Sequence, residues 1–73
     1  MSGNVSNNVS DYRNKNKVTQ EELGKAVGVT RQTIIAIEGG DYLPSVLLAL
    51  KIAKYFQQSV EELFEIALTK SSR

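Results

Sequence analysis

The sequence contains neither cysteine nor histidine among its 73 residues. Without cysteine the chain forms no disulfide, which suits a reducing compartment. Without either residue it lacks the ligands of the usual zinc sites and the side chains of the common cysteine- and histidine-based catalytic arrangements. The acidic residues and lysines that remain form no recognisable catalytic pair. We therefore expect no enzymatic activity, no metal site and no cofactor.

The sequence also lacks any apolar run near the roughly 20 residues that a membrane-spanning helix needs. Its polar start, Met-Ser-Gly-Asn, is unlike a secretory signal. These features predict a cytoplasmic protein with no membrane partner. The net charge is only +1, which permits a nucleic-acid partner without requiring one.

The length predicts one small domain flanked by short tails. Residues 1–8 contain one valine among small polar residues, so a flexible N-terminal tail is expected there. The domain is predicted over residues 9–68, and a C-terminal tail over residues 69–73. A core of this size is marginal without disulfides, which favours tight helical packing or oligomerisation.

Two helices in the middle of the chain have clear start and stop signals. Thr19-Gln20-Glu21-Glu22 is a capping box that begins a helix over residues 20–27. Gly28 ends this helix, because glycine readily takes the left-handed conformation of a helix end. Thr30 caps a further helix that reaches about Glu38 and stops at Gly39-Gly40.

Three more helices are predicted around this pair. The first runs from about Val9 to Asn16 with Asn8 as its cap, and another runs from a cap at Ser45 to about Phe56. A second capping box, Ser59-Val60-Glu61-Glu62, begins a fifth helix, whose apolar residues at i, i+3, i+4 and i+7 are Val60, Leu63, Phe64 and Ala67. No segment alternates with period two, so no strand is expected. The predicted fold is all-α, a compact five-helix domain.

Residues 20–39 meet the steric demands of a helix-turn-helix unit. Two helices that cross steeply through a short turn need a small residue on the first helix, which is Gly24, and a glycine in the turn, which is Gly28. The crossing also needs apolar residues behind the second helix. These residues are Leu23, Val27, Val29, Ile34 and Ile37.

Several separated motifs extend this pattern over residues 8–64. They are Tyr-Arg-Asn-Lys-Asn-Lys-Val-Thr-Gln-Glu-Glu-Leu-Gly, Gly-Val-Thr-Arg-Gln-Thr-Ile, Ile-Glu-Gly-Gly, Leu-Pro-Ser, Ile-Ala-Lys-Tyr-Phe and Ser-Val-Glu-Glu-Leu-Phe. With these motifs the chain resembles the lambda-repressor-like, Cro/cI-type helix-turn-helix family of transcription regulators. The resemblance implies a sequence-specific regulator of transcription, a repressor or an activator, that binds double-stranded DNA as a dimer; we favour the repressor.

The resemblance also implies roles for individual residues. Arg31, Gln32 and Thr33 would contact base edges in the major groove from the first turn of a recognition helix over about residues 30–38. Contacts to the DNA backbone would come from both sides of this helix, namely from Gln20, Thr30, Gly40, Asp41 and Tyr42.

Arg13 and Glu38 resemble a pair that, in this family, joins the first helix to the end of the recognition helix. We favour this structural ion pair over the alternative that Arg13 contacts a phosphate. The sequence departs from the family at Ile35 and Ala36, which stand at positions that are often polar and lie toward the DNA. Gly24 stands where alanine is common, and Gln57-Gln58 replaces a glycine and an apolar residue.

The fourth predicted helix is more apolar than one buried face requires. Ala49, Ile52, Ala53 and Phe56 form a core stripe. The remaining apolar residues predict a homodimer interface, with Leu43, Leu47, Leu50, Ile66 and Leu68 as candidates. Scattered exposed leucines would be the plain alternative. A different kind of function, as an antitoxin or adaptor that binds another protein, would use the same surface and an exposed Ile35.

Overall fold

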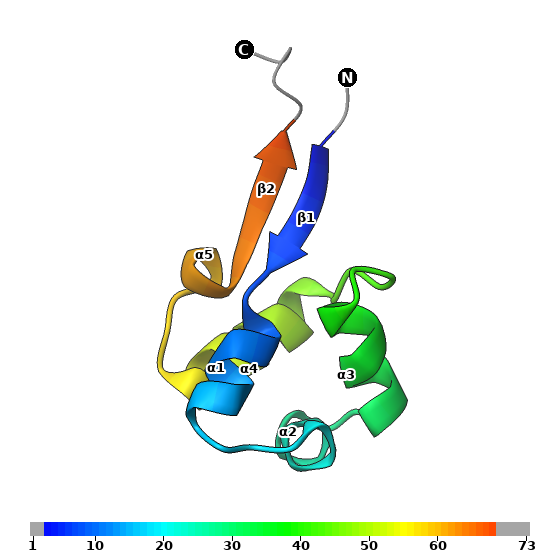
Figure 1. Cartoon of the computed structure of the whole chain (residues 1–73), viewed down its shortest axis with the longest axis vertical. Helices are drawn as coiled ribbons and strands as arrows, with labels where there is room; N and C mark the ends of the chain where they lie inside the picture. The colour runs from blue at the N-terminus through cyan, green and yellow to red at the C-terminus, as the bar shows by residue number, and fades with distance from the viewer. Residues whose placement is uncertain (1–2, 69–73) are drawn as a thin grey trace.

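The structure, a computed structural model, describes residues 3–68 and consists of a helical body with a two-stranded sheet projecting from it (Figure 1). The two strands lie side by side, and Gly3 of the first strand and Leu68 of the second are paired at the end of the sheet that lies away from the body. The elements in chain order are β1 (Gly3–Asn7), α1 (Val9–Lys15), α2 (Gln20–Val27), α3 (Arg31–Glu38), α4 (Val46–Phe56), α5 (Val60–Leu63) and β2 (Phe64–Leu68).

Side-chain caps begin the three longest helices where the sequence predicts them. The Thr19 hydroxyl accepts a hydrogen bond from the Glu22 N–H, and the Glu22 carboxylate accepts one from the Thr19 N–H, which completes the capping box of α2. Thr30 caps α3, and Ser45 caps α4. Each of these oxygens satisfies an N–H that no carbonyl of the helix can reach. The predicted starts of α2, α3 and α4 are confirmed.

Four helices end in the same backbone motif, in which one residue turns left-handed and two N–H groups bond back to the last turn. Glycine fills the left-handed position after α2 and α3, where Gly28 and Gly40 have φ of 83° and 81°. The corresponding residues after α1 and α4 are Lys17 and Gln57, with φ of 58° and 57°. At Gln57 the motif is closed by the Gln58 N–H bonding to the Ala53 carbonyl at 2.9 Å.

Replacing Gln57 by glycine should stabilise the domain by about 0.5 to 1 kcal/mol, because a residue with a Cβ is strained at this φ and glycine is not. Urea unfolding at fixed protein concentration measures the change. Gln58→Gly is the matched control, since it adds the same chain entropy to the unfolded state without relieving any strain. Equal destabilisation by both substitutions would contradict the assignment of strain to Gln57.

The core lies among α1, α2, α3, α4 and α5. The residues with almost no exposed surface are Val9, Leu23, Ile34, Ile37, Ile52 and Leu63. Val27, Leu48, Ala53 and Phe56 complete the buried cluster. One prediction needs correction: in the apolar stripe of α4, Leu48 is buried, whereas Ala49 is only half-buried. Tyr12 packs against this cluster, with its ring centroid 6.0 Å from that of Phe56.

The N-terminal segment is a strand rather than the predicted flexible tail. β1 pairs antiparallel with β2 in a register that joins Gly3 to Leu68 and Asn7 to Phe64. The partners are separated by about 60 positions in the sequence, and β1 is polar, so no local pattern indicated the pairing. Residues 1–2 of the predicted tail and all of the predicted C-terminal tail, residues 69–73, lie outside the described residues.

The fifth helix is shorter than predicted. α5 ends at Leu63, and Phe64 has extended backbone angles of φ −127° and ψ 137°. The five predicted helices are all present, and the sheet is an addition to them. At α1 the predicted cap also differs. Asn8 is the cap residue but its side chain makes no capping bond; instead, the Asn7 side-chain oxygen accepts from the Val9 N–H at 3.1 Å. Among residues 3–68, no helix is long and apolar enough to cross a membrane.

Candidate nucleic-acid interface

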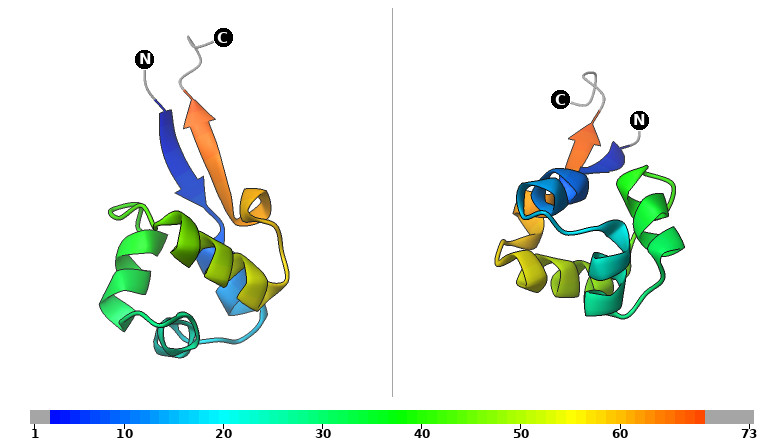
Figure 2. Two further views of the ribbon diagram at one scale, coloured as in Figure 1. Left: turned by 180° about the vertical axis from the view of Figure 1, so that it is seen from behind. Right: turned by 60° about the horizontal axis from the view of Figure 1, so that its bottom comes forward.

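Helices α2 and α3 cross closely because Gly24 has no side chain. A Cβ added at Gly24 would lie 2.7 Å from the carbonyl oxygen of Val29 and 3.2 Å from the carbonyl carbon of Thr30. Both of these atoms belong to the backbone of the turn that leads into α3, so the contact sets the spacing of the pair. Figure 2 shows α2 and α3 side by side in both views, joined by this short turn.

Helix α3 has one buried face and one open face. Ile34 and Ile37 point into the core and are essentially unexposed, whereas Arg31 and Gln32 in the first turn are exposed. Thr33 is half-buried, and its hydroxyl lies 3.2 Å from the Thr30 hydroxyl. Of the three predicted base-contact residues, Arg31 and Gln32 are therefore exposed, whereas Thr33 lies against Thr30, the capping residue of α3.

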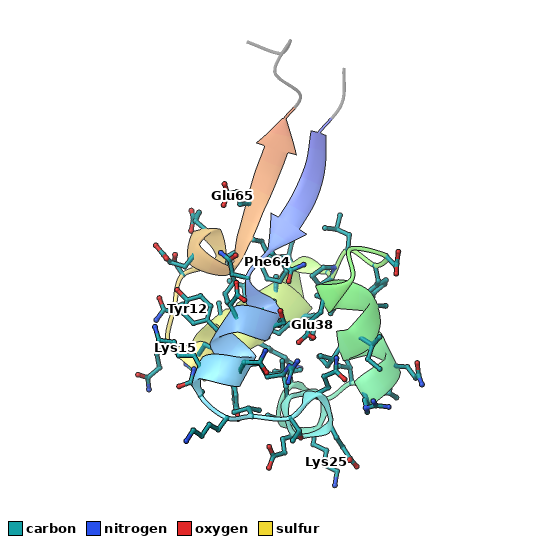
Figure 3. All side chains as sticks on the ribbon, in the orientation of Figure 1. Tyr12, Lys15, Lys25, Glu38, Phe64 and Glu65 are labelled. Atoms are coloured by element: carbon teal, nitrogen blue, oxygen red, sulfur yellow. The ribbon has the colours of Figure 1, made fainter. Side chains whose placement is uncertain are left out.

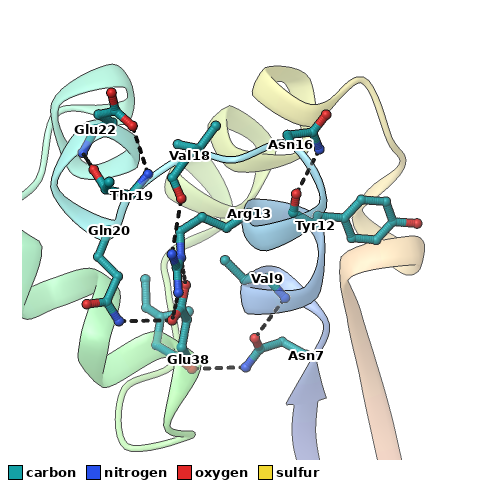
Figure 4. A network of polar contacts seen from close by, with 11 residues as sticks. Asn7, Val9, Tyr12, Arg13, Asn16, Val18, Thr19, Gln20, Glu22 and Glu38 are labelled. Atoms are coloured by element: carbon teal, nitrogen blue, oxygen red, sulfur yellow. Dashed lines mark hydrogen bonds and ion pairs between the residues drawn. The ribbon is translucent and has the colours of Figure 1, made fainter.

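The Glu38 carboxylate joins three helices at the C-terminal end of α3 (Figure 4). Its Oε2 accepts from Arg13 Nε of α1 at 2.7 Å, and its Oε1 accepts from Arg13 Nη2 at 3.2 Å and from Gln20 Nε2 of α2 at 3.1 Å. Arg13 also donates through Nη1 to the Val18 carbonyl at 3.1 Å. The Arg13 and Glu38 side chains are only 13% and 9% exposed. Arg13 and Glu38 thus lie together as a two-point ion pair inside the domain.

Gln20, which is predicted to contact the DNA backbone, has a partner inside the domain, the Glu38 carboxylate. Because its Nε2 donates to a carboxylate, its amide has a fixed orientation, and one N–H of Nε2 remains for another acceptor. The backbone N–H groups of Gln20 and Glu21 begin α2, where no carbonyl of the helix can accept from them.

A polar depression of about 560 Å³ adjoins the start of α2 and gathers residues from α1, α2 and α3. Its lining residues include Arg13, Lys17, Gln20 and Arg31. Lys17 is a residue that sequence reasoning missed. The available signal was its position two residues before the capping threonine, because a cation beside a helix N-terminus forms an anion site together with the N–H groups.

The loop after α3 is exposed to solvent. Gly40, Asp41 and Tyr42, the predicted backbone contacts on this side, are all exposed. The prediction of an exposed Ile35 was wrong, because both Ile35 and Ala36 are half-buried on the sides of α3.

A separate apolar surface lies over the start of α4, and we call it the α4 face. It comprises Leu43, Val46, Leu47 and Leu50, which are 66%, 77%, 63% and 52% exposed. A groove of about 230 Å³ runs beside it between α4 and the α5–β2 junction, lined by Leu43, Pro44, Val46, Ala49, Leu50, Val60, Phe64 and Glu65. Ile66 and Leu68, also predicted for a dimer interface, lie in β2 beyond Phe64.

Figure 3 shows the side chains of the described residues on the ribbon, with Tyr12 and Lys15 labelled on α1. Lys15 lies over the Tyr12 ring, with its Nζ 5.7 Å from the ring centroid. Within residues 3–68, no three acidic, histidine or cysteine side chains gather in a way that could hold a metal ion. The polar depression beside α2 and the open face of α3 remain the candidate site.

A family model described as Helix-turn-helix matches residues 9–63, which is three quarters of the chain. The chain belongs to the lambda-repressor-like helix-turn-helix family. This helix-turn-helix protein is a DNA-binding transcription regulator. The matched residues include all five helices and exclude both strands, β1 and β2.

Relatives and a solved structure agree with this assignment. The chain is 53% identical over 60 residues to the HTH-type transcriptional regulator YgzD of Bacillus subtilis, which covers 82% of this chain and 91% of that protein. It is 52% identical, with the same coverage, to an HTH-type transcriptional regulator of Methanocaldococcus jannaschii. Its structure is similar to that of the P22 c2 repressor in complex with a synthetic operator, with a TM-score of 0.70 and 32% identity over 73% of this chain and 80% of that one.

Proposed function

We propose that this helix-turn-helix protein is a sequence-specific repressor that binds a short two-fold symmetric DNA site as a homodimer. The observation that carries the proposal is the division of α3 into two parts. Its first turn exposes Arg31 and Gln32, whereas Ile34 and Ile37 are buried in the core. The similarity to a repressor that was solved on its operator supports this role. Binding to chromosomal DNA implies a cytoplasmic protein.

Base contacts and backbone contacts would come from different parts of the interface. Arg31 can donate two hydrogen bonds to guanine, and Gln32 can pair in the same two-point manner with adenine. Thr33 would offer its methyl group to a thymine methyl, since its hydroxyl faces Thr30. The start of α2, with Lys17 and Gln20, would hold a phosphate, and the residues 40–42 loop would contact the backbone on the other side, with Thr30 between them.

Gln32→Ala should weaken binding to the preferred site by about 1 to 3 kcal/mol and relax the preference at one base pair. Lys17→Gln should instead weaken binding to every duplex alike, and it should lower the slope of log affinity against log salt by about one. Fluorescence anisotropy titrations on specific and unrelated duplexes, each at several salt concentrations, measure both effects. If the two variants lose affinity with the same dependence on sequence, the division into base and backbone contacts is wrong.

The α4 face is the proposed homodimer interface. Four neighbouring apolar residues that are each more than half exposed form a larger patch than scattered surface leucines do. A two-fold axis through this face would bring the same patch of each copy together. Two half-sites one turn of DNA apart would require the two α3 helices of this dimer to lie about 34 Å apart.

Leu50→Glu should convert the dimer into a monomer, because it places an unpaired charge in the apolar interface. Sedimentation equilibrium measures the mass of the free protein. Gln58→Glu, which adds the same charge at an exposed position outside the groove, should leave the dimer intact. A wild-type protein that is a monomer at high micromolar concentration would rule out the homodimer and favour a different protein on the α4 face, as in an antitoxin or adaptor.

A further inference from the structure

We propose that Asn7 is a positioning residue for DNA recognition, which holds the C-terminal end of helix α3 from the base of the sheet. The inference rests on the proposed function, because α3 is taken there as the helix that contacts bases. It adds a residue outside the helix-turn-helix unit, in a strand that precedes the residues matched by the family model.

The side-chain amide of Asn7 makes one bond with each of its two ends. Its oxygen accepts from the Val9 N–H at 3.1 Å, at the start of α1, and its nitrogen donates to the Ile37 carbonyl at 2.9 Å, in the last turn of α3 (Figure 4). The Val9 N–H can bond only to the oxygen of the amide, and the Ile37 carbonyl can bond only to its N–H. These two partners therefore fix the orientation of the Asn7 amide. The side chain is half-buried.

The backbone of Asn7 is itself held firmly. Asn7 is paired with Phe64 in the β1–β2 register, and the next residue, Asn8, donates its N–H to the Leu63 carbonyl at 2.8 Å. The Ile37 carbonyl accepts a second bond from the Gly40 N–H at 3.0 Å. Asn7 therefore connects a fixed point of the sheet to the turn that ends α3.

This bond bears on DNA binding because it holds the end of α3 opposite to Arg31 and Gln32. Eight residues span about 12 Å, so a small rotation about the C-terminal end moves Arg31 and Gln32 relative to the groove. α1 holds that end through the bond from Arg13 to Glu38. β1 holds it through the bond from Asn7 to Ile37. If the base-contact side chains are displaced by about 1 Å, the protein discriminates less well between base pairs, whereas its contacts to phosphates persist.

The substitution Asn7→Asp separates this role from simple capping of α1. A carboxylate still accepts from the Val9 N–H, but it cannot donate to Ile37, and it sets an anionic oxygen against that carbonyl. Asn8→Asp is the matched control, since it adds the same charge one residue away. It removes a bond from Asn8 Nδ2 to the Glu62 carbonyl, which lies in α5 rather than in α3.

The first measurement compares affinities for a selected duplex and an unrelated duplex at one salt concentration. Asn7→Asp should lower the ratio of the two affinities about tenfold, which corresponds to about 1.4 kcal/mol, whereas Asn8→Asp should leave the ratio unchanged. Asn7→Ser, which brings no charge and can cap α1 but is too short to reach Ile37, should also lower the ratio. An unchanged ratio in both Asn7 variants would overturn the proposal.

The second measurement needs no DNA. Amide NMR shifts and hydrogen exchange at Gly40 and its neighbours should change in Asn7→Asp and not in Asn8→Asp, and acidification that protonates the introduced carboxyl should reverse the change by restoring a donor. Equal changes in both variants would contradict the positioning role. If the wild-type protein binds all duplexes with the same affinity, the proposed function fails. The NMR shifts and hydrogen exchange at Gly40 would still show whether Asn7 holds α3.

Discussion

Replacing Arg13 by methionine should lower the free energy of unfolding by about 3 kcal/mol, because it leaves the Glu38 carboxylate nearly buried without its cation. Gln20 Nε2 would remain as a hydrogen-bond donor to that carboxylate, but an amide does not neutralise a charge. The Val18 carbonyl would lose its bond from Arg13 as well. Urea unfolding at matched protein concentration measures the loss.

A second substitution distinguishes the ion pair from the packing of the arginine stem. Arg13→Met combined with Glu38→Leu should recover much of the stability, because an apolar pair in place of a buried ion pair is often neutral or stabilising. Lys25→Met, at an exposed site of α2, should change stability by less than about 0.5 kcal/mol. Additive losses in the double variant would show that Arg13 and Glu38 do not depend on each other.

Replacing Gly24 by alanine should destabilise the domain by about 1 to 2 kcal/mol, although the same change in an exposed helix stabilises by up to about 1 kcal/mol. The contact distance decides between the two effects. The added Cβ would lie 2.7 Å from a backbone oxygen of the turn before α3, and a backbone atom in a packed turn cannot swing away as a flexible side chain can. The turn and the start of α3 must therefore shift.

This shift predicts a loss of DNA binding beyond the loss of stability. Because Thr30 caps α3 directly after the contact, Arg31 and Gln32 would move with it, and affinity for a specific duplex should fall even where the variant is fully folded. Thermal unfolding and anisotropy titrations provide the two quantities. Lys25→Ala on the same helix serves as the control, and a Gly24→Ala protein more stable than the wild type would contradict the close approach.

The starts of α2, α3 and α4 and the ends of α2 and α3 could be predicted because their causes are local. A hydroxyl at Thr19, Thr30 or Ser45 satisfies an N–H three residues later, and a glycine at position 28 or 40 takes a left-handed φ. Such signals need only neighbouring residues.

The sheet could not be predicted, because its cause lies at the other end of the chain. β1 gains its bonds only when residues 64–68 are beside it, and the spacing of Val60, Leu63 and Phe64 fits a helix equally well. The prediction of the buried stripe of α4 was wrong by one residue, at Ala49 instead of Leu48, for a related reason. With apolar residues around most of this helix, periodicity gives no preference between Leu48 and Ala49, and only the packing of neighbouring elements decides.

The candidate site shows the same division. The exposure of Gln32 follows from the helical phase set by Ile34 and Ile37, so the sequence sufficed to predict it. Arg31 is exposed as the first residue of α3. The role of Asn7 depends on where β1 meets α1 and α3, which no local pattern contains. The partners of Gln20 depend in the same way on the end of α3, 18 residues later in the chain.

The measurement that tests the central claim most directly is selection of bound duplexes from a random pool, followed by a salt titration of the most enriched one. Recognition by two copies of α3 predicts an enriched site with two-fold symmetry, with half-sites about one helical turn apart. It also predicts an affinity at least about a thousandfold above that for unrelated DNA, with a steep fall as salt increases. A pool that stays random through successive rounds, with equal affinity for all duplexes, would contradict sequence-specific recognition by this protein.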